Sequence, residues 1–211
     1  VHQNIAAAGE DITICTSLLD MRSIAGSTSV SEQMVSTFKH WVANQPAGYF
    51  VEAKLAERDQ RHARFGGTRY AVEPNVKDGK GGLRDLHTLF WISKYAYRLD
   101  HVRGVLDAGI LRTSEARAFA SSQRFLWTVR CFLHQHHGRE DDRLTFDAQM
   151  QLAPLMGFAD RSGLRGVERF MKRYYLAARQ VGNLTRIFCA ALATDFDQRP
   201  RLSLRKLWVA G

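Results

Sequence analysis

The sequence predicts a mainly α protein, a helix bundle with a short α/β segment at its N-terminus. Apolar residues recur three and four positions apart over most of residues 83–194, and the connections between these periodic stretches are short. Alternation of the kind that strands show is confined to the first 75 residues or so. The chain has 211 residues and no internal repeat, which suits one large domain or one and a half small ones.

The N-terminal region carries the evidence for a strand. Residues 11–15 read Asp-Ile-Thr-Ile-Cys, and their alternation and β-branched side chains predict a short strand that begins at Asp11. The apolar residues that follow suggest a helical turn closed by Gly26. A polar stretch then separates this turn from the first long helix.

Two helices are expected before the first pair of adjacent glycines. Ser31 could cap the first helix, which would run to residue 44 and end before Pro46. The second is expected over residues 49–65, where the two glycines stop it. Residues 68–72 then read as a short extended segment.

The rest of the chain is predicted to be helical. A helix that starts at Leu83 is apolar on much of its surface, so we expect it at the centre of the bundle. Thr113 and Asp147 are candidate caps of later helices. The later helices are expected over residues 102–106, 113–137, 148–156 and 164–194, and a basic, irregular tail follows them.

The charge balance points to an anionic partner. The chain has 30 basic and 21 acidic residues, a formal charge of +9 and a pI near 9.8. Nucleotide phosphate, nucleic acid or an acidic protein surface would fit this charge, but nucleic acid is disfavoured because the basic residues are spread through the helices. Three cysteines without CxxC spacing fit free thiols in a reducing cytosol, and no apolar run approaches membrane-spanning length. We therefore expect a cytoplasmic protein with no membrane partner.

The most informative stretch is residues 73–87, where glycines and cations gather at the start of a helix. These residues are Gly79, Gly81 and Gly82, with Lys77, Lys80 and Arg84 beside them. The glycines permit a positive φ or a close approach of the backbone, and a helix N-terminus offers free N–H groups to an anion. The stretch could therefore bind phosphate. The alternative is an ordinary glycine-rich helix start with solvated cations, because the spacing fits neither a Walker loop nor a GxGxxG fingerprint.

The same stretch carries a family resemblance. Glu73-Pro-Asn-Val-Lys-Asp-Gly-Lys-Gly-Gly-Leu-Arg-Asp-Leu-His-Thr resembles the signature of the bifunctional uridylyltransferase/uridylyl-removing enzymes, which modify the PII nitrogen-signalling protein. Further stretches resemble that family in the same order along nearly the whole chain. They are residues 11–26, 54–68, 142–149 and 167–175.

The resemblance implies an activity and a cofactor. Such an enzyme transfers UMP from UTP to a tyrosine of PII with Mg²⁺ and releases pyrophosphate. It belongs to the polymerase-β-like nucleotidyltransferases, in which three carboxylates on a sheet hold two Mg²⁺ ions. Asp11 fits the third of these carboxylates, as a catalytic residue and metal ligand, and Asp20 is a weaker candidate. The alternative is that Asp11 is a turn residue before a strand.

The resemblance also implies a division of the chain. Residues 1–75 would be the end of the nucleotidyltransferase domain, with a short α/β remnant of its sheet. Residues 76–195 would be its helical bundle domain, and residues 196–211 a linker towards a hydrolase domain. The Gly-Ser and DxD element that supplies the other two carboxylates is absent from this sequence. We therefore expect the longer enzyme to be active and this chain to be inactive by itself.

The resemblance places nucleotide binding in the glycine-rich stretch. Lys77 and Arg84 would neutralise triphosphate oxygens, and Asn75 could bind sugar or base. The backbone of Gly81 and Gly82 would approach the phosphates closely. Asp85 would hold Arg84 or Lys77 in place or assist a metal. The alternative for Asp85 is an internal ion pair with Arg84 that fixes the start of the helix.

Other interpretations are kept open. The related glutamine synthetase adenylyltransferases have a similar signature with Gly-Gly-Ile-Arg-Glu character, although Gly-Gly-Leu-Arg-Asp-Leu-His over residues 81–87 favours a uridylyltransferase. A non-catalytic helical interaction module is the alternative from another class. His134 and His137 share a helix face, but without a carboxylate in ligand geometry they suit a helix C-terminus better than a metal.

Overall fold

The computed structural model describes residues 1–99, 104, 109–161 and 163–197 and is helical. Within these ranges no strand occurs, and β pairing is limited to isolated bridges, Asn75 with Arg143 and Arg161 with Leu164. The helices are α1 (His2–Glu10), α2 (Ile12–Leu19), α3 (Thr28–Ala43), α4 (Ala47–Arg64), α5 (Leu83–Ala96), α7 (Thr113–His137), α8 (Phe146–Leu155) and α9 (Gly166–Asp197).

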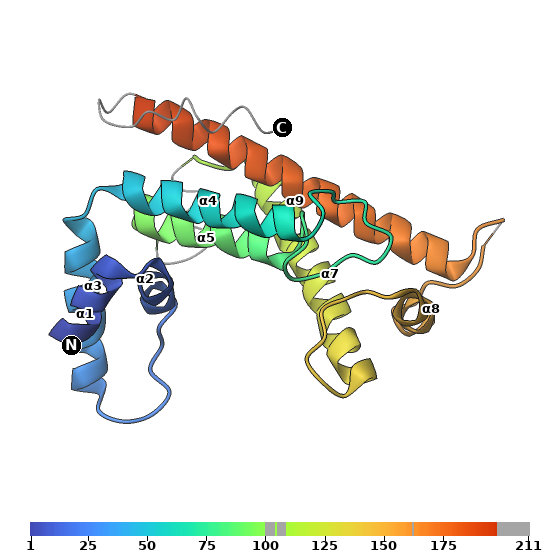
Figure 1. Ribbon diagram of the computed structural model, residues 1–211, viewed down its shortest axis with the longest axis horizontal. Helices are drawn as coiled ribbons and strands as arrows, with labels where there is room; N and C mark the ends of the chain where they lie inside the picture. Colours follow the sequence, from blue (N-terminus) through green and yellow to red (C-terminus); the bar gives the residue numbers. More distant parts are fainter. Residues whose placement is uncertain (100–103, 105–108, 162, 198–211) are drawn as a thin grey trace.

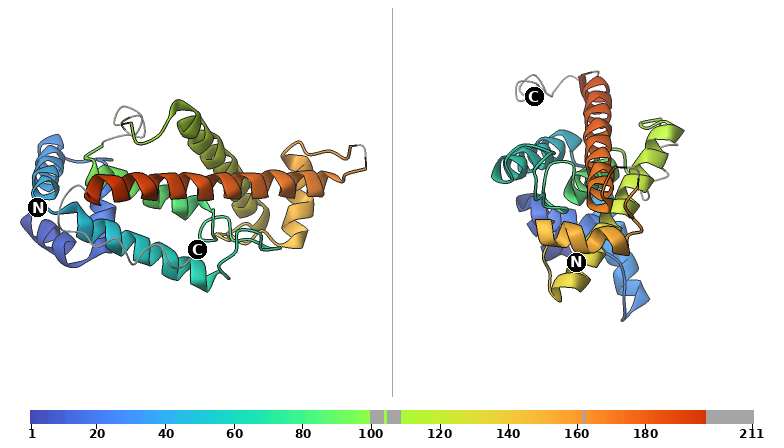
Figure 2. Two further views of the ribbon diagram at one scale, coloured as in Figure 1. Left: turned by 90° about the horizontal axis from the view of Figure 1, so that it is seen from above. Right: turned by 90° about the vertical axis from the view of Figure 1, so that its right-hand side faces the viewer.

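The long helix α9 organises the molecule. It runs along the longest axis, and α4 and α5 lie side by side beneath it (Figure 1). Helices α1, α2 and α3 gather at one end, whereas α7 and α8 pack against the other half of α9 (Figures 1 and 2). The loop between α4 and α5 therefore lies close to α7 and α9, which are distant from it in sequence.

The N-terminal strand prediction is wrong. Residues 12–15 begin α2, and Asp11 is its N-cap, with Oδ1 accepting from the N–H of Thr13 at 2.6 Å and of Ile14 at 3.4 Å. A short β-branched run fits a strand or a helix, and the cap together with burial of Cys15 and Thr16 selects the helix. The predicted extended segment at residues 68–72 forms no strand either, so the α/β remnant is not found in the described residues.

Most predicted helices are confirmed, with shifted ends. Helix α7 ends at His137 as predicted, but its N-cap is Arg112 and Thr113 is its first residue. Helix α9 starts two residues later than predicted and continues to Asp197. Helix α3 starts after Ser27 rather than Ser31, and the α8 cap is Thr145 rather than Asp147. The predicted helix at residues 102–106 and the tail beyond residue 197 lie outside the described residues.

The predicted central helix, α5, is confirmed. Its buried side chains face α4, α7 and α9 together, which explains its apolar surface. Two of its aromatic side chains, Trp91 and Tyr95, are buried, and Tyr95 stacks on Phe50 of α4 with ring centroids 4.1 Å apart. The bundle core continues along α7 and α9 through Leu126, Val129, Leu133, Phe170, Tyr174, Val181 and Phe188.

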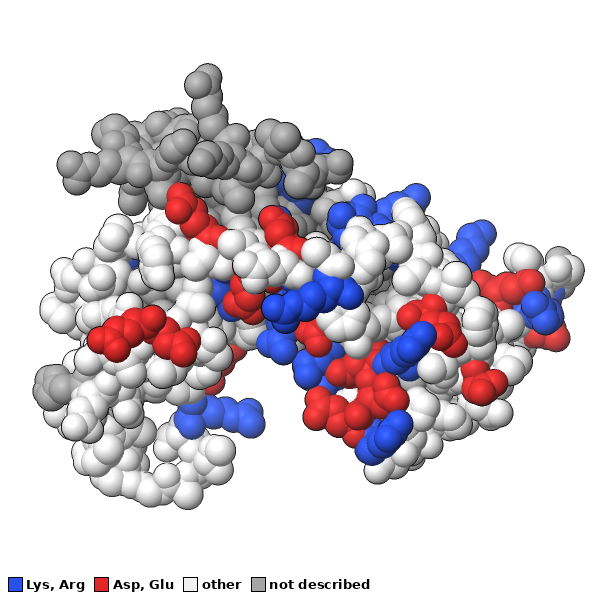
Figure 3. Space-filling model, viewed as in Figure 1, with Lys and Arg blue, Asp and Glu red and all other residues white. Residues whose placement is uncertain are grey.

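The surface is polar and mixed in charge. Acidic and basic side chains are interspersed over the half that contains α7 and α8, and the surface is hollowed between α7 and the group formed by α1, α2 and α3 (Figure 3). The three cysteines are free, Cys15 buried and Cys131 exposed. None of the described helices combines the length and the apolar character needed to cross a membrane.

Candidate functional site

The glycine-rich loop, defined as residues 73–82, is held between α9 and the connection from α7 to α8. Two backbone hydrogen bonds join it to that connection, from Val76 N–H to Asp142 at 2.8 Å and from Leu144 N–H to Pro74 at 2.9 Å. The side chain of Gln149 donates to the carbonyls of Val72 and Leu144. The loop is thereby fixed to a segment about 70 residues further along the chain.

Asn75 shapes the interior of the glycine-rich loop. Its Oδ1 accepts from the N–H of Lys77 at 3.1 Å and of Asp78 at 2.6 Å, which is an Asx turn. Its carbonyl accepts from Gly79 N–H at 3.0 Å. In this structure the Oδ1 of the amide that was predicted to bind sugar or base accepts hydrogen bonds from the loop itself.

The glycines are required because protein backbone passes close to them. Gly81 has φ +83°, and a Cβ there would lie 2.6 Å from the carbonyl oxygen of Ala178 on α9. A Cβ on Gly82 would lie 2.7 Å from the carbonyl oxygen of Val76. The expected close approach is therefore present, and the neighbours that require it are α9 and the loop itself.

The first amides of α5 already have acceptors. The N–H of Gly82 donates to Gly79, that of Leu83 to Val76 and that of Arg84 to Lys77, all at 2.9–3.0 Å. The N–H of Gly81 donates to the Asp85 carboxylate at 2.8 Å. A phosphate at this helix start would have to compete with acceptors that the chain supplies itself.

Asp85 is buried, with 2% of its surface exposed, and it connects α5 to α4. Its Oδ1 lies 2.5 Å from Arg61 Nη2 and 2.8 Å from His62 Nε2. Burial by itself would raise the pKa of Asp85, but hydrogen bonding and charge from His62, the charge of Arg61 and the Gly81 N–H outweigh it and lower the pKa. The ion pair considered for Asp85 with Arg84 is not formed, because its charge partners are on α4.

Lys77 and Arg84 are partly exposed and loosely paired. Arg84 Nε lies 3.4 Å from Asp78, and Lys77 Nζ lies 3.2 Å from Glu140 and 3.8 Å from Asp142. The Lys77 and Arg84 side chains are 27% and 31% exposed. Both cations therefore face solvent from a well-fixed backbone, which suits a role in binding an anion.

Asp142 links the glycine-rich loop to α7. Its carbonyl accepts from Val76, and its carboxylate accepts from Arg130 at 2.7 Å and lies 3.0 Å from His134 Nε2. Burial opposes ionisation, but the hydrogen bonds from Arg130 and His134 and nearby positive charge lower the pKa of Asp142. His134 is thus a hydrogen-bond partner of the Asp142 carboxylate, which joins the glycine-rich loop to α7.

Comparison with known proteins decides the family. The family GlnD PII-uridylyltransferase matches residues 49–189, which include the glycine-rich loop and helices α5, α7 and α8. The chain belongs to this family. This confirms the resemblance seen in the sequence.

Curated relatives of the uridylyltransferase family match nearly the whole chain. "Bifunctional uridylyltransferase/uridylyl-removing enzyme" proteins of Rhodospirillum rubrum and Azospirillum brasilense are each 48% identical over 207 residues, which is 98% of this chain and 22% of the relative. The protein of that name from Bradyrhizobium sp. (strain ORS 278) is 50% identical over 192 residues, 91% of this chain and 21% of its own. The chain thus spans about a fifth of the length of these relatives. No solved structure matches the chain.

The predicted metal-binding carboxylate of this uridylyltransferase-family chain lies apart from the glycine-rich loop. Asp11 is exposed and belongs to the group of α1, α2 and α3 at one end of the molecule, whereas the loop lies beside α7 and α9 (Figures 1 and 2). The N–H of Thr13 is the main cause of a lowered pKa at Asp11. Asp20, the weaker candidate, binds Trp91 Nε1 and Lys94 Nζ. Within the described residues no cluster of three or more His, Cys, Asp or Glu could hold a metal ion, so they do not fit a Mg²⁺ site by themselves.

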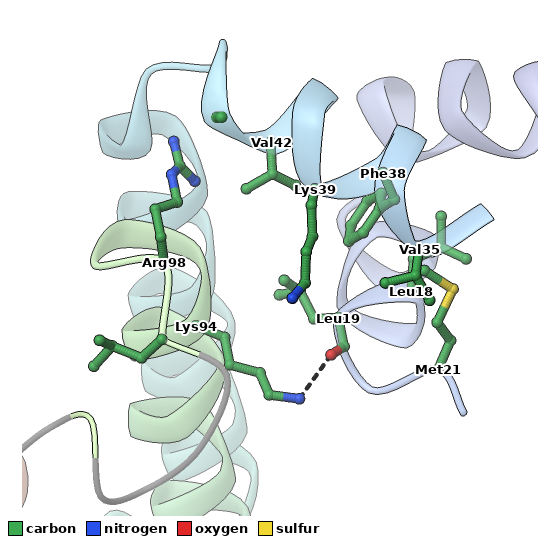
Figure 4. Close-up of a pocket in the computed structure, with 11 residues that line it drawn as sticks. Leu18, Leu19, Met21, Val35, Phe38, Lys39, Val42, Lys94 and Arg98 are labelled. Atoms are coloured by element: carbon green, nitrogen blue, oxygen red, sulfur yellow. Dashed lines mark hydrogen bonds between the residues drawn. The ribbon is translucent and has the colours of Figure 1, made fainter. Parts of the chain in front are cut away.

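A cavity of about 520 Å³ is separate from the glycine-rich loop. It is lined by apolar side chains of α2 and α3, with Lys39, Lys94 and Arg98 among them (Figure 4). Lys94 Nζ donates to the carbonyl of Leu19 at 2.7 Å (Figure 4). None of the residues predicted for nucleotide binding lines this cavity.

The residues outside the glycine-rich loop that hold it in place were not predicted from the sequence. Arg61 and His62 belong to a basic run on α4 whose pattern fits either a solvated face or a surface near a nucleotide, yet both contact buried Asp85. Arg130 carries no local pattern either, whereas Asp142 opens the stretch 142–149 that resembles the family. The available signal was the carboxylate Asp85 on an apolar helix, which requires positive partners when it is buried.

Proposed function

We propose that this chain is part of a uridylyltransferase that transfers UMP from UTP to a tyrosine of the PII protein, and that the longer enzyme also removes it. Family membership carries the proposal: the matching relatives bear both activities in their name. The relatives' names also favour uridylyl over adenylyl transfer. We place this activity in the cytoplasm, with UTP and PII as partners.

Within this function, the glycine-rich loop would serve as a rigid mount for Lys77 and Arg84. Glu140 and Asp78, the nearest carboxylates to Lys77 and Arg84, are 67% and 27% exposed, and such surface ion pairs contribute only about 0–1 kcal/mol, so their exchange for a phosphate oxygen costs little. The carboxylate of Asp142, which is 9% exposed, lies further from Lys77, at 3.8 Å. Asn75, Gly81, Gly82 and Asp85 would act by holding the loop in shape, since each is committed to internal contacts.

Mg²⁺ is proposed to accompany UTP in the longer enzyme, and Asp11 is proposed as one exposed carboxylate available to it. The metal would need further ligands beyond those that the described residues supply.

Calorimetry of UTP binding in the presence of Mg²⁺ tests the proposal on the enzyme at the full length of its relatives. A Lys77→Ala/Arg84→Ala variant is expected to bind UTP at least about 100-fold more weakly, because two charge-assisted hydrogen bonds of about 1.5–3 kcal/mol each are lost. Arg139→Ala/Arg165→Ala removes the same charge from side chains that are 76% and 75% exposed and should change binding less than about twofold. Equal UTP affinity in the Lys77/Arg84 variant and the wild type would show that the loop is architectural only.

A further inference from the structure

A cleft of about 210 Å³ lies between the glycine-rich loop, the segment that precedes it and α9. Its walls include Arg69, Lys80 and Arg143, together with Glu73 and Tyr174. The hydroxyl of the neighbouring Tyr175 donates to the carbonyl of Ala71 at 3.1 Å, which ties the wall to α9. Lys77 and Arg84 do not line this cleft, so it is distinct from the surface they present.

The cleft carries unbalanced positive charge. Arg143 lies 2.8 Å from Glu73, so these two charges compensate each other. Neither Arg69 nor Lys80 forms an ion pair with any carboxylate in the described part of the chain. Two uncompensated cations in one concave site attract an anion more strongly than the paired Lys77 and Arg84 do.

Arg69 is held in place at a structural cost. A Cβ at Gly182 of α9 would lie 2.6 Å from Arg69 Nη2, so a larger residue there would push the guanidinium aside. Glycine within a helix costs about 1 kcal/mol relative to alanine. The Nε of Arg69 is buried without an acceptor among the described residues. A buried donor without a partner costs about 1–3 kcal/mol, and an anion within hydrogen-bond distance of it would remove that cost.

The size and the donors of the cleft define the ligand class. Its volume is below the range of about 300–1,000 Å³ that is usual for drug-sized ligands, and guanidinium, ammonium and phenol groups all donate hydrogen bonds. Burial raises the pKa of Tyr174, so its hydroxyl stays protonated and able to donate. A compact oxyanion with several acceptor oxygens meets these requirements.

We propose that this cleft binds a phosphate group, with Arg69 and Lys80 as its principal ligands and Gly182 as the residue that makes room for Arg69. The phosphate could be free inorganic pyrophosphate or the terminal phosphates of a bound nucleotide, and both share this chemistry. This proposal is argued from the contacts within the cleft and does not depend on uridylyl transfer.

Titration of the chain with inorganic pyrophosphate, followed by calorimetry, tests the cleft. Arg69→Gln and Lys80→Gln are each expected to weaken binding about tenfold or more. Arg165→Gln, at a side chain 75% exposed and paired with Glu168, lowers the net charge equally and should leave affinity within about twofold. Circular dichroism confirms that each variant is folded.

Gly182→Ala provides a test that keeps every charge. The added methyl displaces the Arg69 guanidinium while favouring the helix, so pyrophosphate binding should fall about as much as in Arg69→Gln. No binding by the wild type, or unchanged affinity in Arg69→Gln and Lys80→Gln, would overturn the proposal. An equal loss of pyrophosphate affinity in Arg165→Gln and Arg69→Gln would also overturn it, because the anion would then be attracted by the net charge of the protein rather than by the cleft.

Adding UTP distinguishes the two sources of phosphate. If UTP displaces pyrophosphate and loses affinity in Arg69→Gln, the cleft receives the phosphates of the nucleotide. If pyrophosphate stays bound beside UTP, the cleft receives the free anion. Either result supports the cleft, and failure of UTP binding in the longer enzyme would count against the proposed function alone.

Discussion

At the scale of single residues, Asp85 gathers the most donors around one buried group. Its carboxylate accepts from Arg61 and His62 on α4 and from the N–H of Gly81 in the glycine-rich loop. Removing the negative charge leaves the Arg61 guanidinium buried without compensation. Breaking a buried pair in this way is costly, whereas loss of an exposed pair is nearly neutral.

Asp85→Asn is therefore expected to lower the free energy of unfolding by about 3 kcal/mol at pH 7. Urea denaturation followed by circular dichroism measures the change. Asp78→Asn removes the partner of Arg84 from a pair that is 27% and 31% exposed and should cost less than about 1 kcal/mol. If the two variants lose equal amounts of unfolding free energy, the buried ion pairs of Asp85 contribute no more to stability than an exposed pair.

The same residue determines a pH dependence. Because the folded pKa of Asp85 lies below its ordinary value of 3.8, its contribution to stability is complete above that value. The contribution is lost as the pH falls from about 4 through the folded pKa. The free energy of unfolding should therefore drop more steeply below about pH 4 in the wild type than in Asp85→Asn.

The residues of the loop show what sequence could predict at this scale. The glycines and the helix start at Leu83 were predictable, because only glycine tolerates a positive φ beside close backbone. The partners of Asp85 were not, because Arg61 and His62 lie more than 20 positions earlier and no local spacing relates them. The assignment of nucleotide-binding roles within the loop stays a prediction.

At the scale of elements, the contact between the glycine-rich loop and α9 depends on Gly81. Gly157, after α8, has a similar φ of +79°, but a Cβ added there would have no atom within 4 Å. The two glycines therefore separate the cost of backbone strain from the cost of overpacking.

Gly81→Ala is expected to lower the free energy of unfolding by at least about 3 kcal/mol, from strain and overpacking together. Gly157→Ala should cost only the strain, about 1 kcal/mol. Thermal and urea unfolding measure both. If the two variants lose equal stability, α9 does not constrain the loop as the structure shows.

Helices with a long apolar repeat were predicted well, and short ones were not. The repeat along α7 and α9 leaves few alternatives, so the predicted ranges agree with the structure to within three residues at each end. Residues 11–15 are too few to show a period. Their helical state depends on the Asp11 cap and on packing of α2 against α1 and α5.

At the scale of the whole molecule, the segments before and after residue 75 share contacts. Phe50 stacks on Tyr95, and Trp91 Nε1 donates to Asp20 at 2.5 Å. The predicted domain division there stays a prediction about the longer enzyme. Within this chain, the shared core argues for a single unfolding transition.

Urea unfolding followed by circular dichroism and by tryptophan fluorescence should give coincident transitions. Phe50→Ala, at a side chain 3% exposed, should shift both by about 3–5 kcal/mol. Phe146→Ala, 56% exposed, should shift them by less than about 0.5 kcal/mol. Two separated transitions, only one of which moves in Phe50→Ala, would show that the N-terminal helices unfold independently.

The packing of the glycine-rich loop against α9 has a consequence for protein synthesis. Gly81 contacts Ala178, and Arg69 rests on Gly182, so the surface that shapes this loop leaves the ribosome long after the loop itself. At about 5–20 residues per second, roughly 100 residues must be translated between the loop and its support, which takes on the order of 5–20 seconds. During that interval α5 has an uncovered apolar face, and the nascent chain is a natural client for a chaperone until α9 arrives.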